Sequence, residues 1–199
     1  QADTREYLDH VLGQNCWAYR ISVKACSSKG GLEQSEFSKL FTEFMRLAKR
    51  AKPCYWLRGY IGIWQEKKTQ EMPEFTLDVV LFFNDRCQAQ LFTVVQDLNQ
   101  RWNNFLDTKA VQILKLQDAE NIRYFGLIEP KILMRSVDGL NTAYKAQNTY
   151  HVCIETFDRK MKKMVIEHVI PYFTYRDVFQ APFRQNVPKV FIKGAIPKK

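Results

Sequence analysis

The chain has 199 residues, of which 46% are hydrophobic and 26% are charged, and its formal net charge at pH 7 is +9. This length and composition are typical of one folded domain, so we expect residues 1–199 to share a single core. No run of 18 apolar residues occurs, which excludes a transmembrane helix, and the first ten residues are too polar for a signal peptide. We therefore expect a cytoplasmic protein with no membrane partner.

The cysteine and histidine residues lack the spacing of a metal site. The five cysteines are widely separated and contain no CxxC pair, and none of the three histidines lies within five residues of another. Structural zinc sites normally need such closely spaced ligand pairs. We therefore expect no zinc ion or other resident cofactor, and we expect reduced cysteines that pack as small apolar side chains.

The positive charge is concentrated in the last third of the chain. Residues 131–199 contain thirteen Lys or Arg and five Asp or Glu, a surplus of +8, whereas residues 1–130 contribute only +1. Such a surplus also occurs on solvated surfaces that have no dedicated ligand. Its concentration in one segment nevertheless favours contact with a polyanion, and nucleic acid is the first candidate.

The first quarter of the chain predicts a helix, a strand and a second helix in that order. Residues 4–13 have the pattern of a short helix. The segment CWAYRISVKAC, residues 16–26, alternates between apolar and polar side chains, which indicates a half-exposed strand with Arg20 and Lys24 on its polar face. Ser35 is a candidate helix N-cap, and the apolar side chains after it recur at spacings of three, four and seven, which predicts a long helix.

Two apolar strands follow, residues 55–66 and 75–83, and the polar loop KKTQEMP between them predicts an antiparallel hairpin. The remaining predicted elements are a helix over 85–105, strands near 122–127 and 150–156, a helix over about 159–172 and a last strand near 189–194. This order predicts an α+β fold. It consists of a single antiparallel sheet of about five strands with helices mainly on one face, related to ferredoxin-like architectures.

The strand PEFTLDVVLFFN, residues 73–84, carries an acidic side chain, Asp78, in the middle of an apolar run. A strand this apolar is typical of the centre of a sheet, where a carboxylate needs a partner or a chemical role. The candidate partners on neighbouring strands are Arg20, Lys24 and Arg58. Alternatively, Asp78 and Glu66 could hold Mg²⁺ or Mn²⁺ with Thr76 as a weak neighbour, because these hard cations prefer oxygen ligands.

Three stretches, PEFTLDVVLFFN, QDLNQRWNNF and HVIPYFTYRDVF, follow one another after the strand RGYIGIWQE. In this order they resemble the inovirus-type replication initiators of the HUH endonuclease superfamily. In that family a strand with the pattern His-apolar-His leads into a helix that carries a Trp, and a much later helix holds a Tyr with a Lys three residues on. The resemblance spans residues 18–194 and depends on the order of the elements more than on identical residues.

The resemblance implies a mechanism from which this sequence departs. In the family, two histidines bind a divalent metal that polarises the scissile phosphate, and the tyrosine attacks the phosphorus and stays linked to the DNA. Here the histidine positions are Thr76 and Asp78, and the tyrosine position is Tyr172, with Tyr175 at the lysine position. Tyr172 also lies on the apolar stripe of its predicted helix, where it could pack in the core. The position of the family's third metal ligand, a Glu or Gln, falls at Gln65 or Glu66.

The basic residues are the candidates for contact with DNA, because phosphate groups need only positive charge within reach. Trp56, Tyr60 and Trp64 recur along one predicted strand, and an exposed aromatic ring there could stack on an unpaired base. The basic residues assigned to DNA contact are Arg20, Lys24, Arg58, Lys160, Lys162, Lys163, Arg176, Lys189 and Lys193.

Three functions are compatible with these patterns. In the first, the chain is a DNA-binding protein that resembles a rolling-circle replication initiator without its metal site, and it binds single-stranded or hairpin DNA without cutting it. In the second, it is an active nicking and joining endonuclease with Tyr172 as nucleophile and Mg²⁺ or Mn²⁺ as cofactor. In the third, it is a protein-binding module of a plasmid, phage or other mobile element with an acidic host partner. The substituted histidine positions favour the first function.

Overall fold

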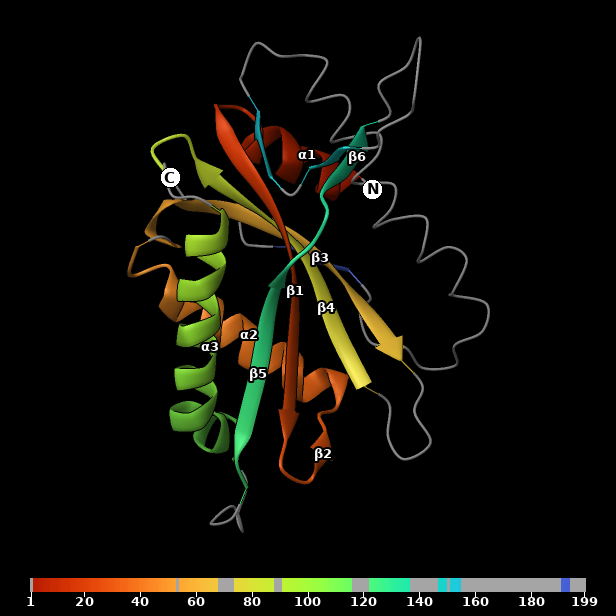
Figure 1. Cartoon of the computed structure of the whole chain (residues 1–199), viewed down its shortest axis with the longest axis vertical. Coiled ribbons are helices and arrows are strands. Elements are labelled where there is room, and N and C mark those ends of the chain that lie inside the picture. The colour runs from red at the N-terminus through yellow and green to blue at the C-terminus, as the bar shows by residue number, and fades with distance from the viewer. Residues whose placement is uncertain are drawn as a thin grey trace.

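The computed structural model is an α+β fold built on an antiparallel sheet, as the sequence predicts (Figure 1). The strong curl of this sheet and a separate two-stranded sheet of residues 134–136 and 147–149 were not predicted. The structure describes residues 2–52, 54–67, 74–87, 91–115, 122–136, 147–149, 151–154 and 191–193. The helical elements are α1 (Ala2–Val11), α2 (Gln34–Ala48), the 3₁₀ turn η1 (Cys54–Trp56) and α3 (Leu91–Leu114). The strands are β1 (Cys16–Ser27), β2 (Gly30–Gly31), β3 (Leu57–Lys67), β4 (Glu74–Asn84), β5 (Tyr124–Pro130), β6 (Met134–Ser136), β7 (Gln147–Thr149), β8 (His151–Ile154) and β9 (Phe191–Lys193). None of the helices in these ranges is long and apolar enough to cross a membrane.

Strand β1 is at the centre of the main sheet and is paired along both edges. On one edge it pairs with β4 and, beyond the end of β4, with the short β2; on the other edge it pairs with β5 and β8. Strand β3 pairs with the free edge of β4, and β9 pairs with β3. All of these pairings are antiparallel, and the predicted hairpin of two apolar strands is present as β3 and β4. The sheet therefore has five strand positions, in the order β5 and β8, β1, β4 and β2, β3, β9.

One face of the sheet carries the larger core, which α2 and α3 cover. Side chains of β1 such as Tyr19, Ile21 and Val23 alternate onto this face and meet the apolar stripes of both helices. Trp102 of α3 is fully buried here, against the rings of Phe37 and Phe44. Helices α2 and α3 thus bury the apolar side chains that β1, β3, β4 and β5 direct to this face, with the 3.6-residue periodicity that the sequence predicts.

Helix α1 covers only part of the opposite face. Its side chains Tyr7, Leu8 and Val11 pack against Ala18 of β1 and Val80 of β4 in a second, smaller core. These residues belong to the first half of β1 and the last half of β4, so α1 sits over one end of the sheet (Figure 1). The other end of this face, formed by the last residues of β1 and the first residues of β4, lies beyond α1.

The outer edge of β5 is closed by side chains of α3. The backbone N–H groups of Gly126 and Ile128 donate to Asn103 Oδ1 at 3.1 Å and to Asn99 Oδ1 at 2.8 Å. Trp102 Nε1 donates to the carbonyl oxygen of Lys24 at 2.9 Å, and it passes directly over Gly126, where a Cβ would clash with the indole. The N–H groups at this sheet edge, which could otherwise pair with a further strand, are thereby hydrogen-bonded within the chain.

A tyrosine from α1 hydrogen-bonds the outer edge of β3 at Tyr60, just before the residues that pair with β9. The Tyr7 hydroxyl accepts from the Tyr60 N–H at 2.9 Å and donates to the Tyr60 carbonyl oxygen at 3.0 Å. Gly59 allows this approach, since a Cβ there would meet the Tyr7 hydroxyl and the Val11 methyl. Both backbone groups of this buried edge residue are therefore satisfied by one hydroxyl.

One local prediction is wrong by two residues. Helix α2 begins at Gln34 with Glu33 as its N-cap, not with Ser35. The Glu33 N–H donates to the Glu36 carboxylate at 3.1 Å, and the Glu33 side chain accepts from the N3 backbone, so a capping box of two glutamates satisfies the first turn. Ser35 already lies inside this turn.

Candidate nucleic-acid interface

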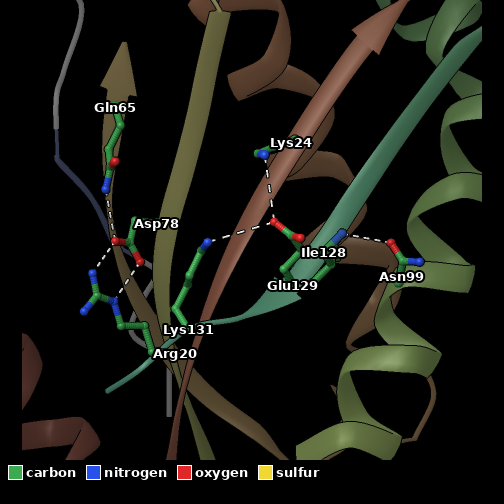
Figure 2. A network of polar contacts seen from close by, with 8 residues as sticks. All are labelled: Arg20, Lys24, Gln65, Asp78, Asn99, Ile128, Glu129 and Lys131. Carbon is green, nitrogen blue, oxygen red and sulfur yellow. Dashed lines mark hydrogen bonds and ion pairs between the residues drawn. The ribbon is translucent and has the colours of Figure 1, made fainter. Parts of the chain in front are cut away.

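Asp78 lies on the face that α1 partly covers, and we call this the Asp78 face. The side chain is buried, at 4% exposure, and three donors surround its two oxygens (Figure 2). Arg20 donates from Nε to Oδ1 at 3.0 Å and from Nη2 to Oδ2 at 2.5 Å, and Gln65 Nε2 donates to Oδ2 at 3.0 Å. Arg20 is the partner among the three cations considered from the sequence.

The Arg20 side chain also fixes the segment that follows β5. Its Nη1 donates to the Ile132 carbonyl oxygen at 2.9 Å, and its own carbonyl oxygen accepts from the Lys131 N–H at 2.8 Å. Arg20 is 18% exposed at its side chain. A carboxylate this buried is tolerated because a bidentate guanidinium and an amide supply charge and hydrogen bonds together.

The two carboxylates considered for a metal pair are not brought together. Gln65 pairs with Thr76 and Glu66 with Phe75, so alternation along β3 directs Gln65 to the Asp78 face and Glu66 to the opposite face. Within the described ranges, no group of three or more His, Cys, Asp and Glu side chains could hold a metal ion. Because both oxygens of Asp78 already accept hydrogen bonds from Arg20 and Gln65, the residues present do not fit Mg²⁺ or Mn²⁺ at this position.

Beyond α1, the Asp78 face carries partly or largely exposed side chains, and we call this area the open end. Its residues are Lys24 and Cys26 of β1, Thr76 of β4, and Phe125 and Leu127 of β5. Phe125 is 50% exposed and Leu127 is 41% exposed, whereas the alternate β5 residues Tyr124 and Ile128 are buried against α3. The open end therefore combines two apolar side chains with a lysine.

Lys24 of the open end and the neighbouring Lys131 share one carboxylate. Lys24 Nζ lies 3.8 Å from Glu129 Oε2, and Lys131 Nζ lies 4.0 Å from the same oxygen (Figure 2). At these distances and with about half of each side chain exposed, such ion pairs contribute little to stability. One positive charge of the three groups remains uncompensated, so this cluster can attract an anion.

A pocket of about 470 Å³ lies beside the open end, between the start of β4 and the turn that joins β1 to β2. It forms because the pairing of β4 with β1 ends at Lys24 and the pairing of β2 begins at Cys26. Lys24, Lys29 and Glu74 are its charged lining residues. Burial, and next the charge of Glu74, raise the pKa of the Cys26 thiol, so this cysteine stays protonated at neutral pH.

Two other described cations assigned to DNA contact, Arg58 and Lys193, lie on or next to β3. Arg58 donates from Nη1 to the Val11 carbonyl oxygen at 3.4 Å and from Nη2 to the Gln14 side chain. It therefore ties the C-terminal end of α1 to β3, where a cation also suits the helix dipole. Lys193 belongs to β9, next to β3.

The remaining sequence-predicted site residues lie outside the described residues. They are Tyr172, Lys160, Lys162, Lys163, Arg176 and Lys189. The predicted helix over 159–172 lies there as well, so the geometry between Asp78 and Tyr172 stays a prediction.

Two of the three aromatic residues considered for base stacking are buried, and the third, Trp56 of η1, is partly buried. Tyr60 and Trp64 are buried in the core under α2, where their rings meet Phe41 and Phe37, and Trp56 packs against the same core. Among the described residues of the Asp78 face, the exposed ring is that of Phe125, which the sequence analysis did not single out. The stretch YFGLIEP did contain a signal for the exposure of Phe125. A glycine within a strand often marks the face that a bulky neighbour approaches, so Phe125 and Leu127, on either side of Gly126, point to the other face.

Comparisons with family models, curated proteins and solved structures found no match to this chain. The function must therefore be argued from the residues themselves.

Proposed function

We propose that this protein binds DNA, in single-stranded or hairpin form, across the Asp78 face and with its basic last third, and that it does not cleave the DNA. The main strands follow the order β5, β1, β4, β3 with helices between β1 and β3 and between β4 and β5. This is the strand order of the ferredoxin-like split βαβ architecture. It supports the resemblance to the HUH-type initiators, whose fold is of that kind.

The observation that carries the proposal is the occupied carboxylate of Asp78. Asp78 stands where the resembled family has a metal-binding histidine, and its two oxygens accept from Arg20 and Gln65 instead of facing an open site. In the resembled family the bound metal polarises the phosphodiester for attack by the tyrosine, and an Asp78 whose oxygens are already hydrogen-bonded does not supply that metal site. Binding survives such a loss, because contact with phosphates needs only cations.

The distribution of charge supports a polyanion as the ligand. The surplus of +8 in residues 131–199 lies in the segment that begins with Lys131, which Arg20 holds beside the Asp78 face. DNA bound across this face would thus start from the Lys24 and Lys131 cluster and continue along the basic last third.

A denaturing gel tests the absence of cleavage. Labelled hairpin and single-stranded DNA are incubated with the protein and Mn²⁺ under conditions in which anisotropy shows binding. We expect binding without any covalent protein–DNA adduct. An adduct that forms with the wild type and is lost in Tyr172→Phe would replace this proposal with the endonuclease function.

A triple variant tests the contribution of the basic last third. Replacing Lys160, Lys162 and Lys163 together by Ala should weaken DNA binding and reduce its salt dependence. Each lost phosphate contact lowers the number of counterions that are released from the DNA on binding. The melting temperature should change little, because lysine side chains are seldom buried and their loss normally has small effects on stability. An unchanged binding isotherm at about 0.1 M salt would move the interface away from this segment.

A further inference from the structure

Two large apolar side chains of the open end are exposed. Phe125 and Leu127 are consecutive outward residues of β5, at 50% and 41% exposure. Only Tyr55 and Phe92 are comparably exposed large apolar residues among the described ones. Exposed apolar side chains that lie side by side commonly mark a binding surface.

The geometry of the open end restricts what can bind there. A peptide added as an extra strand would need free backbone groups, but Asn99 and Asn103 already accept from the outer N–H groups of β5. A ligand that lies on the face itself meets only side chains, because backbone hydrogen bonds lie within the plane of a sheet. Apolar packing, ring stacking, side-chain hydrogen bonds and ionic contacts are the interactions that remain.

The size and charge of the open end favour a nucleotide over a protein helix. An amphipathic helix buries anchor residues over several turns, whereas the exposed apolar surface here consists mainly of Phe125 and Leu127. Lys24 pairs with Leu127 in the sheet register, and Lys131 meets Lys24 at Glu129. An aromatic ring is thus followed along β5 by a cluster with one uncompensated positive charge, which complements a base followed by its phosphate.

We propose that an unpaired nucleobase stacks on Phe125, beside Leu127, while its backbone phosphate is held by Lys24 and Lys131. The site therefore selects single-stranded nucleic acid, because both faces of a base within a duplex are already covered by its neighbours. This inference depends on the proposed function and assigns the kind of ligand to the same face. Stacking of this type tolerates any base, since every base has a flat face.

Anisotropy titrations with three fluorescent probes test the inference. The probes are the oligonucleotide dT12, a 12-mer of abasic residues with the same phosphates, and a 20-base-pair duplex. Phe125→Ala should weaken dT12 binding about tenfold, in the range known for loss of one stacked base. It should leave binding of the abasic strand unchanged, and the wild type should prefer dT12 to the duplex. Phe92→Ala is the matched control, because Phe92 is 66% exposed on α3, away from the open end, and its loss should change nothing.

The outcomes separate this inference from the proposed function. If the wild type binds none of the probes and no hairpin DNA either, the proposed function itself fails. If the wild type binds dT12 but Phe125→Ala binds it equally well, or loses dT12 and abasic binding alike, only the stacking site is refuted. A large fall in the melting temperature of Phe125→Ala would also refute it, because Phe125 would then be a packing contact of the chain itself.

Discussion

Replacing Asp78 by Asn would keep the size of the side chain and remove the charge that Arg20 and Gln65 surround. The single oxygen of asparagine can still accept a hydrogen bond at the position of Oδ1. At the position of Oδ2, however, its NH₂ group cannot accept and would face the two donors, Arg20 Nη2 and Gln65 Nε2. Loss of one partner of a buried ion pair typically costs about 3–5 kcal/mol. Arg20 keeps some solvent access and its bond to the Ile132 carbonyl, so we expect about 3 kcal/mol.

Urea unfolding followed by tryptophan fluorescence measures this loss, since the chain contains four tryptophans. For a protein of this length, the expected loss corresponds to a fall in melting temperature of roughly 6–12 °C. Asp97→Asn is the control, because Asp97 pairs with Arg101 at 2.6 Å one turn along α3, where both side chains keep about a third of their surface exposed, and its loss should cost only about 0.3–0.5 kcal/mol.

Two results would refute the reasoning about Asp78. One is a loss below about 1 kcal/mol in Asp78→Asn, which is the range of a surface ion pair. The other is a rise in the wild-type melting temperature with added Mn²⁺ that Asp78→Asn abolishes, because a metal-holding carboxylate behaves in this way.

Three further substitutions test single contacts of the fold. Gly126→Ala should cost about 1–3 kcal/mol in urea unfolding, because its methyl group would meet the Trp102 indole and, at 2.6 Å, the carbonyl oxygen of Lys24; full stability would contradict this packing. Tyr7→Phe should speed hydrogen exchange of the Tyr60 amide and cost about 1–3 kcal/mol, because both backbone groups of Tyr60 lose their partner; unchanged exchange would contradict it. Burial raises the pKa of Cys54 from its ordinary value of 9.0 to about 12, so the thiol keeps its proton to a higher pH in the folded state than in the unfolded state. Stability should therefore fall as the pH rises from 9.0 to about 12, and Cys54→Ala should flatten that fall; identical pH profiles would refute it.

The sequence predicted that Asp78 needs a partner but could not choose it. Ser22 lies directly opposite Asp78, so Arg20 and Lys24 are both diagonal neighbours on the same face. Lys24 turns instead to Glu129, which β5 brings to its side from more than a hundred residues away. The choice thus depends on a long-range pairing that local patterns do not contain.

The faces of β3 were ambiguous for a related reason. Tyr60 and Trp64 alternate with Ile61 and Ile63, so both faces of the strand are apolar in sequence. Either set could have been the exposed one, and in the structure both are buried, one under α2 and the other under α1. The element types and the hairpin were predictable because periodicity and turn residues are local, whereas the exposure of Phe125 depends on how far α1 extends over the sheet.

The binding of DNA itself is tested most directly by titrating labelled dT12 with the wild-type protein at several salt concentrations. We predict tight binding at about 50 mM salt and a linear decrease of log K with log salt, with a slope of about −2 or steeper, as expected for three or more neutralised phosphates on a single strand. An absence of binding at 50 mM salt, or an affinity that does not depend on salt, would contradict the account.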